Sequence, residues 1–179
     1  MKRLYITLIL FLLLILEGVA LEILPNKWLI GSFLIVPHWV LVWLIIIALF
    51  YDKQETHHAV VFAAIFGFLI DTVYTGILGV YMFTYAVTIY LIHGVSRFLQ
   101  VNFFSTMLFV ILGVAIVDIS IESIYYVMGI IQISWQDYVV HRLFPTIVAN
   151  LLFLFLFYPL VMKRIKRWSN EKYNRGPTM

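Results

Sequence analysis

The sequence has no cysteine and few charged residues, and both shortages restrict what the chain can be. Without cysteine there is no disulfide, zinc–thiolate site, iron–sulfur cluster or cysteine nucleophile. Charged residues make up only 12% of the 179 residues, about half their share in an ordinary soluble domain. Because a soluble chain of this length would still need a large wetted exterior, the shortage of charge argues against a soluble domain.

The sequence also lacks the short motifs of most enzymes and nucleotide-binding proteins. It shows no glycine-rich phosphate loop, no Ser-His-Asp arrangement and no pair of carboxylates set in a cleft. His57 and His58 are adjacent, so on a helix they would point about 100° apart and make a poor metal pair. We interpret them as part of a solvated loop, and His38 as a residue at the membrane interface. The sequence therefore predicts no enzyme activity, no cofactor and no metal.

Long apolar runs are what the sequence has in abundance. Hydrophobic residues make up 64% of the chain, and the mean hydropathy is +1.02. A helix needs roughly 20 such residues to cross a bilayer core of about 30 Å. The sequence predicts an all-α polytopic membrane protein, a six-helix transmembrane bundle that forms one domain over residues 1–179. The predicted spans cover approximately residues 5–24, 28–50, 59–75, 77–96, 104–128 and 143–162.

Two of these spans allow more than one interpretation. The first has the layout of a secretory signal peptide, but Glu17 and the many later spans favour a retained helix. The second contains Pro37, so it is either one kinked helix or a segment at the interface followed by a span that begins near the proline. Between the third and fourth spans, Gly76 and Gly79 predict a tight turn and hence an antiparallel hairpin.

The basic residues predict the orientation of the bundle. With six spans, ten of the twelve Lys and Arg residues fall on the side that carries both termini, and only Lys27 and Arg142 fall on the other. Basic residues mark the cytoplasmic side, so both termini are expected there, and residues 163–179 form a basic cytoplasmic tail whose polar end frays. The net charge of +3 then reports topology and contact with the lipid bilayer, and it does not indicate a nucleic-acid partner.

Acidic residues lie inside the predicted spans at Glu17, Asp71, Asp118 and Glu122, with Glu22 further out still. A central Asp costs roughly 2.5–3.5 kcal/mol on insertion, so such residues are expected to face protein or a wet cavity. Asp118 and Glu122 share a helical face, as do Arg142, Thr146 and Asn150. The sequence therefore predicts a buried polar network in the outer half of the bundle, with Arg142 the one cation placed to meet the acids. Its members are Glu17, Asp71, Asp118, Glu122, Arg142 and Asn150.

Three interpretations of this network stay open from the residues alone. It is an internal packing network, a site for a small molecule or proton, or a face on which a partner's membrane helix docks. Ala63 and Gly67 line up with Asp71 in a strip of small residues that allows close helix packing. Gly79 and Gly113 are further candidates for close helix contact.

Four motifs occur in order and span nearly the whole chain. They are Val36-Pro37-His38, Phe66-Gly67-Phe68-Leu69-Ile70-Asp71, Tyr74-Thr75 with Leu78-Gly79-Val80-Tyr81, and Arg142-Leu143-Phe144-Pro145-Thr146 with Asn150. Together they resemble the signature of the rod shape-determining protein MreD, most closely in its Gram-positive members. In this resemblance, Pro37, Gly67, Phe68, Gly79 and Pro145 are the helix-packing and motif residues.

The resemblance implies a function that the spacing of residues does not show. It implies a non-enzymatic scaffold in the bacterial cytoplasmic membrane, part of the elongasome that extends peptidoglycan in rod-shaped cells. The implied partners are MreC, the actin-like MreB filament, the RodA glycosyltransferase and a class B penicillin-binding protein, joined through helix–helix association. The implied fold is similar to the S component of energy-coupling-factor transporters. The alternative is a small-molecule-binding or transport subunit that uses the outer acidic cluster, and a homodimer stays open.

Overall fold

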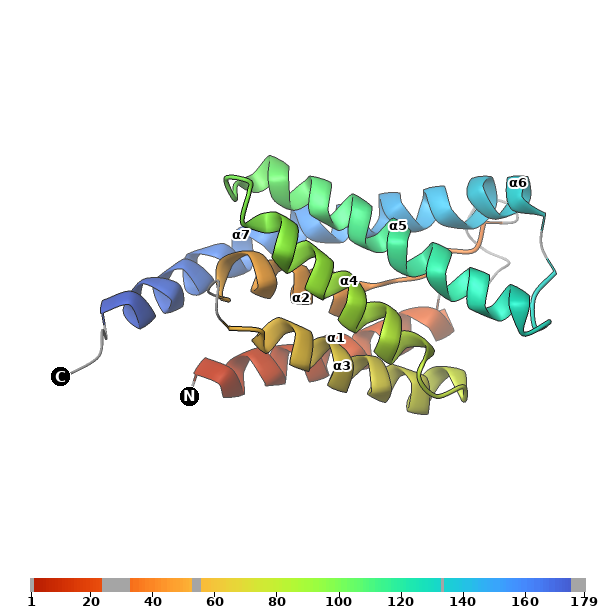
Figure 1. Cartoon of the computed structure of the whole chain (residues 1–179), viewed down its shortest axis with the longest axis horizontal. Coiled ribbons are helices and arrows are strands. Elements are labelled where there is room, and N and C mark those ends of the chain that lie inside the picture. The colour runs from red at the N-terminus through yellow and green to blue at the C-terminus, as the bar shows by residue number, and fades with distance from the viewer. Residues whose placement is uncertain (1, 24–32, 53–55, 133, 175–179) are drawn as a thin grey trace.

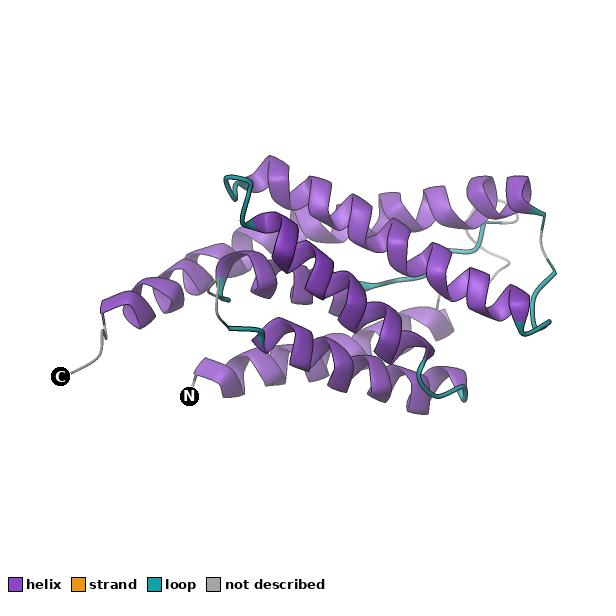
Figure 2. Ribbon diagram, viewed as in Figure 1, coloured by secondary structure: helices purple, strands orange, loops and turns teal. Residues whose placement is uncertain are grey.

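The computed structural model describes residues 2–23, 33–52, 56–132 and 134–174, and within them the chain is helical with no strand (Figure 2). A π-helical turn, η1 (Asp71–Thr75), continues α3, and a second one, η2 (Val139–Leu143), joins α6 to α7 in one continuous helix. The described residues therefore form a six-helix bundle, which confirms the predicted all-α class. The helices are α1 (Lys2–Ile23), α2 (Trp39–Phe50), α3 (His58–Ile70), α4 (Val80–Ser96), α5 (Phe103–Val127), α6 (Trp135–Tyr138) and α7 (Phe144–Asn174).

The length and composition of these helices fit a bilayer. Four segments are long and apolar enough to cross it, and α2 and α4 are shorter apolar helices. Large apolar side chains on the outside of the bundle, such as Leu8, Phe83 and Leu152, are exposed. Because water would not favour so much exposed apolar surface, these faces meet lipid. The four long segments are Leu4–Glu22, His58–Thr75, Phe103–Val127 and Trp135–Met162.

The bundle has two distinct ends (Figure 1). At one end α1 begins, and the connections α2–α3 and α4–α5 lie there too; we call this the proximal end. The turn between α3 and α4 and the connection between α5 and α6 lie at the opposite, distal end. The acidic residues of the predicted network lie toward the distal ends of α1, α3 and α5.

Helix α2 is short and lies in the centre of the bundle. Its 12 residues span about 18 Å, well under the roughly 30 Å of a bilayer core. Val40 to Leu49 are all buried, and α2 contacts α1, α3, α4, α5 and α7. A helix that is apolar all round is expected in such a position. Residues 33–38 are non-helical and run through the distal half of the bundle to reach it (Figure 1).

The second predicted span, 28–50, is therefore helical only from Trp39, and residues 28–32 lie outside the described residues. The kinked-helix alternative is wrong, because residues 33–38 are non-helical, whereas the helix does begin near the proline, as the other alternative expects. A proline has no N–H to give to a preceding turn, so a helix that starts just after it loses no hydrogen bond.

The final helical segment is longer than predicted at both ends. It begins at Trp135 instead of residue 143, where the Ser134 hydroxyl accepts a hydrogen bond from the Asp137 amide at 3.2 Å. It continues to Asn174, so the expectation that the polar end of the tail frays is wrong for residues 168–174. That stretch contains no glycine or proline, and the first stop signals in the sequence are Gly176 and Pro177. Residues 175–179 lie outside the described residues.

Candidate functional site

Asp71 is fully buried and binds the start of the next helix. Its Oδ2 accepts hydrogen bonds from the amides of Gly79 at 2.9 Å and Met82 at 3.1 Å, and its Oδ1 accepts one from the Tyr81 amide at 2.9 Å. These amides belong to the N-terminal turn of α4, which has no helical partners for them and carries a partial positive charge. Gly79 takes φ +99°, a conformation that favours glycine. Asp71 therefore caps α4 and fixes the α3–α4 turn.

Gly67 brings α3 and α4 into backbone contact. A Cβ atom at Gly67 would lie 2.7 Å from both the Met82 Cα and the Tyr81 carbonyl oxygen. Backbone atoms cannot move aside as a side-chain end can, so only glycine fits here. Ala63, one turn earlier, is also fully buried, whereas Phe68 is exposed on another side of α3. The Gly67 and Asp71 positions thus hold the same pair of helices together.

Pro145 leaves one carbonyl of its own helix free to bind the extended segment before α2, residues 33–38. A proline at position 145 cannot donate to the carbonyl four residues earlier, which belongs to His141. That carbonyl instead accepts a hydrogen bond from the Leu34 amide at 2.8 Å. The π-helical turn η2 surrounds this position and also contains Arg142. Backbone that is not helical at this depth needs such partners, because lipid offers none.

Two further side chains of α7 also form hydrogen bonds with the extended segment. Thr146 Oγ1 accepts from the Val36 amide at 3.1 Å. Asn150 Oδ1 accepts from the His38 amide at 2.8 Å, and its Nδ2 donates to the Val36 carbonyl at 3.1 Å. Alternate amides of an extended chain recur every 6.6 Å or so, and a four-residue step on a helix rises about 6 Å. These two distances are similar, so successive side chains on one face of α7 can each bind a successive amide of the extended segment.

The side chain of Glu17, a residue of α1, reaches the start of α2. It is buried, and its Oε2 accepts a hydrogen bond from the Val40 amide at 3.1 Å. A carboxylate near a helix N-terminus is favoured by the helix dipole. On the same side of the bundle, the Tyr74 hydroxyl donates to the Leu14 carbonyl at 2.8 Å, and a Cβ on Gly18 would run into the Tyr74 ring. Glu17 and Tyr74 thereby fasten α1 to α2 and η1.

Asp118 is the centre of a separate group of polar side chains. Its Oδ1 lies 3.4 Å from Arg142 Nη2 and 3.6 Å from His38 Nε2. Its Oδ2 accepts a hydrogen bond from the Tyr138 hydroxyl at 2.7 Å. Arg142 Nη1 lies 2.7 Å from Glu122 Oε2, so one guanidinium meets both carboxylates of α5. We call Asp118, Glu122, Arg142, His38 and Tyr138 the Asp118 cluster.

His38 is in the core, so the expectation that it lies at the interface is wrong. Its side chain is fully buried, and its Nδ1 lies 3.0 Å from the Tyr85 hydroxyl. The extended segment carries His38 into the bundle, which its apolar neighbours in the sequence did not indicate. Reasoning from sequence also missed Tyr85 and Tyr138, because a tyrosine in a membrane helix gives no signal that it will find a buried partner. The only available signal for His38 was its place in the motif beside Pro37.

The structure divides the predicted polar network into parts. It joins Asp118 and Glu122 to Arg142, and it places Asn150 beside the start of α2. It does not join Glu17 or Asp71 to Arg142 by an ion pair among the described residues, since both carboxylates bind backbone amides instead. All six side chains are nonetheless buried. The prediction that Arg142 meets all of the acids is therefore too broad.

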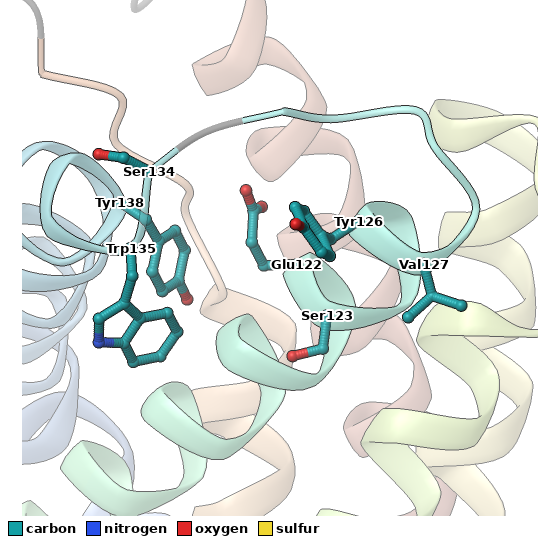
Figure 3. A pocket seen from close by; sticks show the side chains of 7 residues that line it. All are labelled: Glu122, Ser123, Tyr126, Val127, Ser134, Trp135 and Tyr138. Atoms are coloured by element: carbon teal, nitrogen blue, oxygen red, sulfur yellow. The ribbon is translucent and has the colours of Figure 1, made fainter.

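A pocket of about 540 Å³ opens beside the Asp118 cluster at the distal end (Figure 3). Figure 3 shows the Glu122 side chain between the rings of Tyr138 and Tyr126. Aromatic faces beside a carboxylate suit a cationic or amphipathic group. In the Asp118 cluster the two carboxylates meet the Arg142 guanidinium and the His38 imidazole, and the Glu122 carboxylate also lines the pocket, where a cation would meet it. The pocket is lined by Glu122, Ser123, Tyr126, Val127, Ser134, Trp135 and Tyr138.

These features define a polytopic helical membrane protein whose buried polar groups mainly connect its own helices. The model of the family described as rod shape-determining protein MreD matches residues 1–167. The chain belongs to the MreD family and is thus a rod shape-determining membrane protein. It is 29% identical over 157 residues to the rod shape-determining protein MreD of Bacillus subtilis (strain 168), which covers 84% of this chain and 86% of that protein. No solved structure matches the chain, so the similarity to transporter S components stays a prediction.

Proposed function

We propose that the chain is a non-enzymatic scaffold of the cell-elongation complex that holds MreC in the membrane. The observation that carries this proposal is that the buried polar side chains connect segments of the chain to one another. Glu17, Asp71 and Asn150 bind backbone groups of neighbouring segments, so they hold the helices in one arrangement. A bundle with a fixed shape presents a fixed surface, which lowers the entropic cost of docking a partner.

The rim of the distal pocket is the proposed docking surface for MreC. Trp135 and Tyr126 are each 62% exposed there, and Val127 is 85% exposed. Exposed aromatic residues around a pocket are typical of the residues that dominate binding energy at interfaces. The basic residues support an orientation with the proximal end in the cytoplasm. MreB would then face the proximal connections, while RodA and the class B penicillin-binding protein meet the outer surface of the helices.

Co-purification of MreC tests this docking surface. Replacing Trp135 and Tyr126 together by alanine should lower MreC recovery at least tenfold, since two aromatic anchors are lost. The matched control is Leu156→Ala, which removes an exposed apolar side chain from α7 far along the helix and should leave recovery unchanged. Full recovery with the double variant would contradict the surface. Conversion of rods to spheres on depletion, rescued by the wild-type gene, tests the role in elongation separately.

A second candidate function is a small-molecule-binding or transport subunit. It is supported by the size of the distal pocket and by the Glu122 carboxylate that faces it. On this hypothesis, an organic cation raises the melting temperature of the purified chain, and Glu122→Gln removes that effect. A broad ligand screen that raises the melting temperature with no compound would count against it. Such a result would leave the scaffold proposal intact.

A further inference from the structure

A second cluster of polar side chains lies at the proximal end, far from the Asp118 cluster. His93, in the last turn of α4, is only 4% exposed, and neither of its ring nitrogens has a hydrogen-bond partner among the described residues. A buried polar atom without a partner is costly, so such a group is expected to meet a ligand or water. The His57 ring packs against His93 with centroids 5.2 Å apart.

His93 faces two cavities that differ in charge. One, of about 240 Å³, is lined by His57, Tyr90, Leu91, His93, Gly94, Val95 and Arg97. The other, of about 200 Å³, is also lined by Asp52, whose Oδ2 accepts a hydrogen bond from the Ala59 amide at 2.7 Å. The first cavity therefore has imidazole and guanidinium donors and no acidic lining residue, and we call it the His93 cavity. Imidazole and guanidinium N–H groups together are suited to the oxygens of an anion.

Its surroundings indicate which anion. The His93 cavity is at the end of a membrane helix, where lipid headgroups lie, and Phe98 just beyond it is 88% exposed. Leading away from it along α4 is a row of exposed apolar side chains at four-residue spacing, Phe83, Val87, Leu91 and Val95. This row forms one helical face, along which an acyl chain can lie. The cavity holds about eight times the volume of one liquid water molecule, which is room for a phosphate and part of its glycerol.

We propose that the His93 cavity binds the phosphate group of a membrane phospholipid, with an acyl chain along the exposed face of α4. His93 and His57 donate N–H groups to the phosphate oxygens, and Arg97 provides the positive charge. Basic pockets at the ends of membrane helices are known to hold anionic headgroups. This site is separate from the proposed MreC surface at the distal end, so either proposal can fail without the other.

Lipid binding to the purified full-length chain in a neutral maltoside detergent tests the proposal. Dioleoylphosphatidylglycerol should bind and raise the melting temperature, whereas dioleoylglycerol, which has the same acyl chains and no phosphate, should bind at least tenfold more weakly. Inorganic phosphate that displaces the lipid would support the same site and show that the phosphate alone is recognised. Equal binding of the two lipids would overturn the proposal.

Two variants locate the site. Gly94→Leu places a side chain where an added Cβ meets no atom within 4 Å, so it fills the cavity without disturbing the helix. It should weaken phosphatidylglycerol binding tenfold or more, and His93→Leu should do the same. The control Val148→Leu enlarges an exposed side chain on α7 and should bind as wild type. If folded Gly94→Leu protein binds the lipid as tightly as wild type does, the cavity is not the site.

Discussion

Asp71 and Asp118 are both fully buried acids in the same bundle, yet their surroundings differ. Asp71 binds three backbone amides that follow it by only 8 to 11 residues. Asp118 meets side chains from distant parts of the chain, with Tyr138 20 residues and Arg142 24 residues away. Backbone amides cannot be exchanged for other partners, whereas ion-paired side chains can. Asp71 therefore fixes the local α3–α4 turn, whereas the Asp118 cluster connects α5 to the segment that carries Tyr138 and Arg142.

The largest effect is expected from removing the one cation of the Asp118 cluster. Arg142→Met leaves Asp118 and Glu122 buried side by side without their guanidinium, which should cost about 3–5 kcal/mol of folding stability. Thermal or denaturant unfolding in detergent measures this loss. Adding Asp118→Asn to the same protein should restore part of the stability, because one uncompensated charge is removed. A single variant as stable as wild type would mean that the cluster is held by other contacts.

Asp71→Ala tests the other side of the comparison. Three partly buried amides at the start of α4 lose their acceptor, and we expect a loss of about 2–4 kcal/mol. The same unfolding measurement applies. Asp137→Ala is the matched control, since Asp137 lies in the first turn of a helix but is exposed, and its loss should cost under about 1 kcal/mol. Equal effects from the two variants would contradict the special role of Asp71.

Two glycines differ in the space around them, so we expect opposite results when each is replaced by alanine. Gly67→Ala puts a Cβ against the backbone of Met82 and should destabilise the protein by about 1–3 kcal/mol. Gly94→Ala has open space and should be neutral or stabilise by up to about 1 kcal/mol, because alanine favours a helix. Melting temperatures of the two variants, compared side by side, check this. Similar shifts would show that the helices can separate at little cost.

The smallest effect is expected where α7 supports the extended segment. Thr146→Val keeps the shape of the side chain and removes the acceptor of the Val36 amide, at a cost of about 1 kcal/mol. Thr72→Val is the control, since the Thr72 hydroxyl bonds to the Phe68 carbonyl on an exposed face. Hydrogen exchange at Val36 should rise in the first variant only. Unchanged exchange would indicate that water or another group already serves this amide.

Local features were the ones that sequence reasoning predicted well. Six helices, the turn at Gly76 to Gly79 and the burial of the acids all follow from apolar runs, turn residues and the cost of charge in lipid. Helical spacing also places Asp118 and Glu122 on one face, and Arg142 is the one cation in the sequence placed to meet them. The non-helical conformation of residues 33–38 could not be predicted in this way, because an apolar run with one proline is equally consistent with a kinked helix. Its partners lie more than 100 residues away at Thr146 and Asn150.

The sequence by itself determined that this chain is a membrane protein, how many helices it forms and which side chains must avoid the acyl chains. These properties depend on composition and on short-range spacing, which are independent of how the helices meet. Only the tertiary structure decided which partner each acid takes. Asp71 and Glu17 reach helix N-termini while Asp118 reaches Arg142, because the choice depends on which backbone amides other helices leave unpaired nearby. The same packing decided that His38 lies in the core and that His93 faces a cavity.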